Sequence, residues 1–441
     1  MKRILSLFLA LLAVTLSSCS TIKKTPQDGS TNNHFPGQSD EDDDFIKDEF
    51  GFAKFPEGNY LADKKFDTDE YLPDYDADNN FILLGNYGPG GGGICSTDDT
   101  IYYFSESEDM QYCLLMYRDK VTGISAPLCG KPECLHNNKN CNAYVEGSST
   151  FLNGLYIYGD MLYWISRKGI SSVNLDGTNR AFVRGLNSKL FVPVGGITNS
   201  AVMHRGYIYY FSVDQQVTDS KQYYYLKVAA EPIDGCEDGF VIMTRSLNNP
   251  ICQLRFAGND VYIMIGETER REDGDAIGVM ELCRWDSKTR KGEILYKGAL
   301  DDEENVSFDE WFRDFVPIPG DGIYLYKKYS RFEEDGSYVY NSGLCKYSFE
   351  TGEIEHITWL DGERGEIDFV KDSRIYSTYF GTVNISDFEG NLIAQSAQVE
   401  SRSFGEAAGI DDDYIYFLNN GGLHDNYEAV PLDGGDSIIL D

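Results

Sequence analysis

The stretch that decides the fold is Gly159-Asp-Met-Leu-Tyr-Trp-Ile-Ser166, which is followed by Asn174-Leu-Asp-Gly-Thr-Asn-Arg180. Glycine and aspartate at its start are typical of a tight turn, and the aromatic and branched residues after them are typical of a β-strand. The later Asp-Gly pair is typical of a second tight turn, because glycine readily adopts a positive φ. We therefore expect two hairpins here, and hence a unit of four short strands.

This unit recurs from about residue 81 onward, at intervals of roughly 40–60 residues. Its aromatic strand appears at Thr100–Phe104, Met161–Ile165, Gly206–Phe211, Asp260–Met264, Gly322–Tyr326, Arg374–Thr378 and Asp413–Phe417. Four-stranded units that recur in this way predict a β-propeller over residues 81–441. We expect seven blades, and six is the alternative because the copy at Arg374–Thr378 is the weakest.

The composition supports an all-β chain. Among 441 residues it holds 31 Tyr, 25 Phe and 44 Gly but only 13 Pro, and no run of useful length with a helical period separates the units. Aromatic residues favour strands, and glycines favour turns. A β-sandwich is the competing all-β fold, but its strands would not repeat the same unit so regularly.

The stretch quoted first resembles one blade of the YWTD-type propellers of the low-density-lipoprotein-receptor class. The Leu-Tyr-Trp strand and the Leu-Asp-Gly-Thr-Asn-Arg turn carry the resemblance. The tetrad is Tyr163-Trp164-Ile165-Ser166, so its Thr-Asp half is missing. The match is good over one blade and implies the fold rather than a function. The chain also resembles tethered propeller lipoproteins of Gram-positive gut bacteria.

The N-terminus carries a short positive region, Lys2 and Arg3, and then an apolar stretch over residues 4–16. That length suits a signal peptide and is short for a membrane-spanning helix. The following Leu16-Ser-Ser-Cys19 resembles the bacterial lipobox, in which the cysteine thiol takes a diacylglyceryl group. The resemblance implies a signal peptide over residues 1–18, a lipid on Cys19, and a protein anchored outside the cytoplasm to the bacterial cell membrane.

Residues 19–50 have the composition of a flexible tether. They are rich in Ser, Thr, Asn and Asp and include the acidic run Asp40–Asp44. Such a segment buries too little apolar surface to order itself. Residues 51–80 form a transition whose aromatic side chains are expected to pack on the propeller.

The formal net charge of −34 limits the kinds of partner. A chain this acidic will not attract nucleic acid or anionic lipid head groups by charge. We expect it to meet the membrane through its lipid anchor and to bind an extracellular ligand or protein that is cationic, neutral or metal-bearing. An acidic surface that simply maintains solubility is the plainer interpretation.

The residues most suited to chemistry lie in an insert after the first unit, at Cys129, Cys134, His136 and Cys141. Three of the ten cysteines and one of the five histidines fall within this short loop. Three thiolates and an imidazole are a complete ligand set for structural zinc. The spacing is not that of a zinc finger, however, and an extracytoplasmic setting favours a disulfide; a reactive thiol is the third alternative.

The other body cysteines lie mostly in strand-like runs and are expected to be small buried hydrophobic residues. They are Cys95, Cys113, Cys236, Cys252, Cys283 and Cys345. Two acidic runs, Asp273-Gly-Asp275 and Asp301–Glu304, could hold calcium but lack EF-hand spacing, and solvated loops are the simpler interpretation.

Motifs of catalysis are scarce. The chain has no GxSxG elbow, no HExxH and no P-loop, and the glycine run at 87–93 is not followed by a helix-forming segment. We expect a cell-envelope-anchored module that binds a glycan, peptide or protein at one face of the propeller, where loops gather. An extracytoplasmic enzyme, for example a carbohydrate-active one with carboxylates in the channel, and an envelope scaffold are the alternatives.

Overall fold

The computed structural model describes residues 46–55, 82–83, 93–107, 111–147, 152–166, 168–187, 190, 198–218, 221–235, 238–247, 251–270, 276–299, 310–332, 338–362, 365–379, 382–396, 407–419, 426–434 and 436–440. All of them belong to one compact unit, Ser39–Asp441. The expected signal peptide, Cys19, most of the tether and transition, Cys236 and the two acidic runs proposed for calcium lie outside these residues. Within the described ranges, no helix is both long and apolar enough to cross a membrane.

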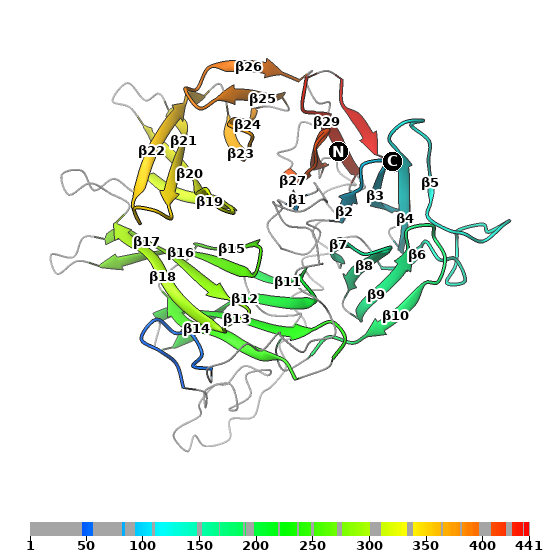
Figure 1. Ribbon diagram of the computed structural model, residues 1–441, viewed down its shortest axis with the longest axis horizontal. Coiled ribbons are helices and arrows are strands. Elements are labelled where there is room, and N and C mark those ends of the chain that lie inside the picture. Colours follow the sequence, from blue (N-terminus) through cyan, green and yellow to red (C-terminus); the bar gives the residue numbers. More distant parts are fainter. Residues whose placement is uncertain are drawn as a thin grey trace, which may run out of the picture. The chain divides into compact units, whose positions relative to one another are not determined.

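Seven antiparallel sheets stand around a ring and form a seven-bladed β-propeller (Figure 1). Blade 1 consists of β2 (Ile94–Ser96), β3 (Thr100–Glu106), β4 (Tyr112–Asp119), β5 (Ser125–Pro127) and β6 (Tyr144–Glu146). Blade 2 consists of β7 (Leu152–Tyr158), β8 (Met161–Ser166), β9 (Gly169–Asn174) and β10 (Ala181–Arg184). Blade 3 consists of β11 (Thr198–His204), β12 (Tyr207–Thr218), β13 (Lys221–Pro232) and β14 (Phe240–Leu247).

Blades 4 to 6 each have four strands. Blade 4 consists of β15 (Ile251–Ala257), β16 (Asp260–Arg270), β17 (Ala276–Asp286) and β18 (Lys291–Ala299). Blade 5 consists of β19 (Glu310–Ile318), β20 (Gly322–Phe332), β21 (Tyr338–Ser348) and β22 (Ile354–Leu360). Blade 6 consists of β23 (Glu366–Lys371), β24 (Arg374–Tyr379), β25 (Thr382–Asp387) and β26 (Leu392–Gln395). Blade 7 is β27 (Ala407–Ile410), β28 (Tyr414–Asn419), β29 (Asn426–Pro431) and β30 (Ile438–Leu440), with β1 (Ile82–Leu83) added.

The predicted repeat is confirmed. Each predicted aromatic strand is the second strand of a blade, and the weakest copy, Arg374–Thr378, lies in β24, so the blade number is seven rather than six. Side chains alternate between the two faces of a strand, so these strands reach both neighbouring blades. Tyr103, Trp164 and Tyr416, for example, pack into one buried cluster that blades 1, 2 and 7 share.

Blade 7 closes the ring because it combines β1, which precedes blade 1 in sequence, with β27 to β30. β1 pairs with the inner strand β27, with Ile82 opposite Ile410 and Leu83 opposite Gly409. The C-terminal strand β30 forms the outer edge of the same blade. Blade 7 therefore depends on chain from before blade 1 as well as on the last four strands.

We call the contact between two neighbouring blades a seam. An ion pair bridges each of the seven seams, in addition to apolar packing. The pairs, from seam 1–2 around to seam 7–1, are Lys168–Glu146, Arg184–Glu231, Arg245–Glu267, Arg255–Asp314, Lys328–Glu366, Lys371–Asp412 and Lys120–Asp411.

Residues 46–55, which precede the ring in sequence, pack against blades 3 and 4. Ala53 N donates to Ile242 O at 2.8 Å, and the Phe52 side chain is only 1% exposed. Gly292 of β18 leaves room for that ring, since a Cβ there would approach Phe52 to 2.3 Å. This short segment is thereby fixed to the outer part of seam 3–4.

Candidate functional site

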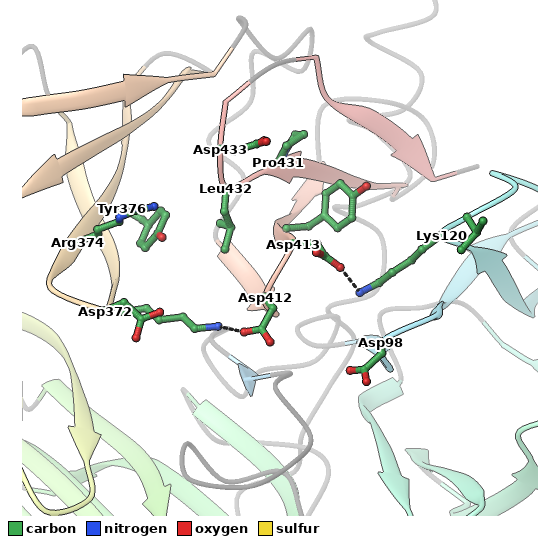
Figure 2. Close-up of a pocket in the computed structure, with 13 residues that line it drawn as sticks. Asp98, Lys120, Asp372, Arg374, Tyr376, Asp412, Asp413, Pro431, Leu432 and Asp433 are labelled. Carbon is green, nitrogen blue, oxygen red and sulfur yellow. Dashed lines mark hydrogen bonds and ion pairs between the residues drawn. The ribbon is translucent and has the colours of Figure 1, made fainter.

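A cavity of about 650 Å³ lies where blades 6, 7 and 1 meet (Figure 2). The residues around it come mainly from turns that join the first strand to the second, or the third to the fourth, in each blade. They are Asp98, Lys120, Val121, Lys371, Asp372, Arg374, Tyr376, Asp412, Asp413, Tyr414, Pro431, Leu432 and Asp433. The pocket therefore opens on one face of the ring, at the junction between the last blades and the first.

Local backbone geometry explains why aspartates occupy these turns. Asp372 and Ser373 have φ values of 50° and 57°, which is the left-handed pair of a type I′ hairpin. Before β28, Asp411 Oδ1 accepts hydrogen bonds from the backbone amides of Asp413 and Tyr414, at 2.8 and 2.7 Å. Short acidic side chains are suited to both arrangements because they bond to nearby backbone.

The Asp411 carboxylate joins blade 7 to blade 1 beside the pocket. Its Oδ2 accepts hydrogen bonds from Ser96 Oγ at 2.6 Å, Tyr416 OH at 2.5 Å and Lys120 Nζ at 2.8 Å. Burial would raise the pKa of Asp411, but the Lys120 ammonium and the donated hydrogen bonds outweigh burial and hold that pKa below its usual value. The ionised carboxylate is therefore the stable form in the folded protein.

The lysines of the pocket already have carboxylate partners. Lys120 Nζ also contacts Asp413 at 3.1 Å, and Lys371 Nζ contacts Asp412 Oδ1 at 2.5 Å (Figure 2). Among the described residues, no ion pair joins Asp98, Asp372 or Asp433 to a cation, and all three are exposed. Arg374 is the third cation of the lining and is exposed as well. Around the cavity, negative charge exceeds positive charge.

The lining of the pocket is rich in carboxylates. The described lining contains no serine, cysteine or histidine that could act as a nucleophile. The carboxyl groups whose pKa is raised by burial, Asp214 and Asp260, do not line the pocket. Tyr414 is partly exposed and adds aromatic surface beside the carboxylates, whereas Tyr376 is only 2% exposed. Together these groups can hold a cation or a hydroxyl-rich ligand.

A second candidate site is the loop between β5 and β6, where the structure brings the four predicted ligands together. One ligand atom each from Cys129, Cys134, His136 and Cys141 lies within 4.8 Å of all the others, and the cluster could hold a metal ion. His136 Nδ1 lies 3.2 Å from Cys141 Sγ. Glu133 and His136 have φ values of 58° and 55°, and these two left-handed residues fold the loop back on itself.

Backbone amides point at the sulfur atoms of this cluster. The amides of Lys131 and Asn142 donate to Cys129, and the amide of Ala143 donates to Cys141. Burial opposes ionisation of Cys129, but the hydrogen bonds that it accepts outweigh burial and lower its pKa. At Cys141, burial and the neighbouring thiols outweigh the amide of Ala143 and raise the pKa to about 12. A metal binds the thiolate form, which the amides favour at Cys129.

All three cysteines are free thiols in the structure. Their sulfurs converge with the imidazole on one point, as a metal site requires, and a disulfide, which would use only two of the sulfurs, stays the alternative prediction. Cys95, Cys113, Cys283 and Cys345 are buried, as expected for small hydrophobic residues, and Cys252 is partly buried.

The sequence predicted the Cys/His cluster but not the pocket. The available signal was the run of acidic residues before the second strand of blades 1, 6 and 7, at Asp98-Asp99, Asp372 and Asp411–Asp413. Aspartate before a strand is typical of a tight turn, so the local sequence indicates no further role for these residues. Their meeting depends on the closure of the ring, which brings Asp98 next to residues more than 270 positions away.

No protein-family model matches the chain, and no curated protein matches it. Among solved structures, the chain is similar to an acylaminoacyl peptidase from Pyrococcus horikoshii, with 12% identity and a TM-score of 0.44 over 82% of this chain and 54% of that one. It is also similar to the β-propeller domain of the Trilobed protease from Pyrococcus furiosus, with 12% identity and a TM-score of 0.41 over 82% of this chain and 97% of that one. The chain thus spans about half the length of the first protein, and the seven-bladed ring is established by its own strand pairings.

Proposed function

We propose that this protein is a binding module of the bacterial cell envelope that holds an extracellular ligand in the pocket of blades 6, 7 and 1. The observation that carries the proposal is a cavity of about 650 Å³ built from the turns of three blades. The buried Asp411 network beside it makes these turns rigid, and a site on a rigid scaffold loses little entropy when it binds.

The charge of the pocket indicates the chemistry of the ligand. The carboxylates of Asp98, Asp372 and Asp433 are exposed, and the whole chain carries a net charge of −34. A ligand with amino or guanidinium groups, such as a basic peptide or an amino sugar, would be attracted by this field and would pair with these carboxylates. The partly exposed ring of Tyr414 would cover its apolar part.

The proposed lipid on Cys19 accounts for how such a module is held at the membrane. The proposed location is therefore the outer surface of the bacterial cell membrane, with the pocket open to the surroundings.

We also propose that the ion of the Cys/His cluster is zinc rather than calcium. Thiolates and imidazole are ligands that zinc prefers, whereas calcium takes oxygen ligands. Metal analysis of protein prepared without reductant tests this identity. One zinc per chain is expected, whereas a disulfide in this loop without metal would contradict the proposal.

A glycan and peptide array tests the binding function. The full chain should bind cationic members, and a triple variant with Asp98→Asn, Asp372→Asn and Asp433→Asn should lose most of that binding. A matched triple variant with the same change in charge, Asp238→Asn, Glu350→Gln and Glu389→Gln, alters exposed turns elsewhere and should bind normally. Equal loss in both variants, or no binding by the unaltered chain, would overturn the proposal.

A further inference from the structure

Seam 1–2 differs from the other six in how its ion pair is placed. At each of the other seams, at least one side chain of the pair is no more than 24% exposed. At seam 1–2, Lys168 is 71% exposed and Glu146 is 46% exposed. Exposed pairs contribute little to stability, because water screens them and both side chains lose freedom. In the described part of the chain, seam 1–2 therefore has no buried ionic link.

The Cys/His loop supplies other contacts across this seam. Gly130 N donates to Gly177 O of blade 2 at 3.1 Å, and Asn142 Nδ2 donates to the same oxygen at 2.7 Å. In the opposite direction, Arg180 of blade 2 donates to the carbonyl oxygens of Cys141, at 3.1 Å, and Tyr144. Each blade thus donates hydrogen bonds to the backbone of the other.

The blade 2 turn lies directly against the first metal-ligand residue. Gly177 has a φ of +77°, and a Cβ there would lie 2.7 Å from Cys129 N. Such a close approach requires glycine. Arg180 is placed at the end of the same turn, and its guanidinium lies 5.6 Å from the centroid of the Trp164 ring, inside blade 2. The turn and the loop are therefore fitted to each other.

The loop atoms that make these contacts belong to metal-ligand residues or are close to them in sequence. Gly130 follows Cys129, Asn142 follows Cys141, and the carbonyl of Cys141 itself accepts from Arg180. Fixing the two cysteine sulfurs on one ion would fix these backbone atoms as well. Without an ion, a loop with no regular secondary structure would have to hold this arrangement by itself.

We infer that the metal centre of Cys129, Cys134, His136 and Cys141 fastens blade 1 to blade 2, at the seam whose ion pair has both side chains largely exposed. This inference rests on the proposed zinc ion. Arg180 is a positioning residue, because it binds the metal loop without being a ligand. The metal thereby stabilises the ring as well as its own loop.

Hydrogen–deuterium exchange on the full chain in detergent tests the inference at residues 174–180 of blade 2, which contain no ligand. Removing zinc with a chelator should speed exchange of this turn by about tenfold or more, and adding zinc back should restore protection. The turn at residues 232–235 in blade 3, at the neighbouring seam 2–3, serves as the control and should not change. Unchanged protection at 174–180 after complete zinc removal would overturn the inference.

Two variants separate failure of the seam role from failure of the zinc site. Arg180→Ala should keep one zinc per chain yet exchange faster at the blade 2 turn, whereas Cys129→Ser should lose both zinc and protection. If Cys129→Ser loses zinc while the turn stays protected, the seam role is wrong and the zinc site stands. If the unaltered chain holds no zinc and its loop cysteines are oxidised, the zinc proposal itself is wrong.

Discussion

Replacing Asp411 should destabilise the ring more than replacing any exposed carboxylate near the pocket. Asp411 is 3% exposed, and its two oxygens accept hydrogen bonds from Ser96, Tyr416, Lys120, Asp413 and Tyr414. In Asp411→Ala these donors lose their acceptor, and Lys120, whose side chain is 8% exposed, loses its buried partner. Removing one partner of a buried ion pair costs about 3–5 kcal/mol.

A second estimate agrees with that size. Five hydrogen bonds at about 1 kcal/mol each give a loss of about 5 kcal/mol in the free energy of unfolding. Chemical denaturation followed by tryptophan fluorescence measures this loss from the shift in the transition midpoint. Asp412→Ala is the matched control, because its carboxylate pairs with Lys371 but is 55% exposed, and it should cost no more than about 1 kcal/mol. An Asp411→Ala effect below that of the control would refute the reasoning.

The same carboxylate gives a pH dependence with a definite sign. The pKa of Asp411 is lower in the folded protein than in the unfolded chain, so ionisation stabilises the fold. That contribution is complete above the unfolded pKa of about 4 and is lost as the pH falls through the lower folded value. The difference in stability between the unaltered chain and Asp411→Ala should therefore be constant from pH 5 to 7, as a rough window, and should narrow below about pH 4. A difference that widens in acid would contradict this sign.

Further substitutions test the other packing claims. Phe52→Ala should lower the free energy of unfolding by about 3–5 kcal/mol, because a fully buried ring is removed. Limited proteolysis of this variant should then cut near residues 46–55. Unchanged resistance to protease would contradict the packing at seam 3–4. Gly177→Ala should destabilise the chain by roughly 2 kcal/mol or more, since the new Cβ would meet backbone of blade 1. Gly159→Ala is the control, because Gly159 also has a positive φ, +57°, but a Cβ there would meet nothing within 4 Å. It therefore tests the backbone strain without a close contact and should lower the free energy of unfolding by about 1 kcal/mol. Equal effects of Gly177→Ala and Gly159→Ala on thermal unfolding would show that the close contact does not matter.

The repeat was predictable because each blade has a recognisable pattern in its own local sequence. An aromatic strand between two turns, such as Met161–Ile165 before the Asp176-Gly177 turn, requires only short-range periodicity and turn chemistry. The strands adopted the predicted order in all seven copies, including the weak copy at Arg374–Thr378.

The pocket and the seams depend on contacts between distant parts of the chain. Lys120 and Asp411 are separated by 291 positions, and nothing in either local sequence marks the other as its partner. The cysteine loop could be predicted from the sequence only in part. Its ligand types were evident, but whether three sulfurs converge depends on left-handed backbone at Glu133 and His136. Neither residue type requires that conformation, so the sequence does not predict it.

The most direct test of the proposed function is a footprint of the bound ligand. A cationic member of the array that binds the full chain should slow hydrogen–deuterium exchange in the turns around Asp98, Asp372 and Leu432, which come from three different blades. The described ends of the second strands and starts of the third strands, which lie toward the opposite face, should not change. Protection of that opposite face, with the three turns unaffected, would contradict the assignment of the pocket.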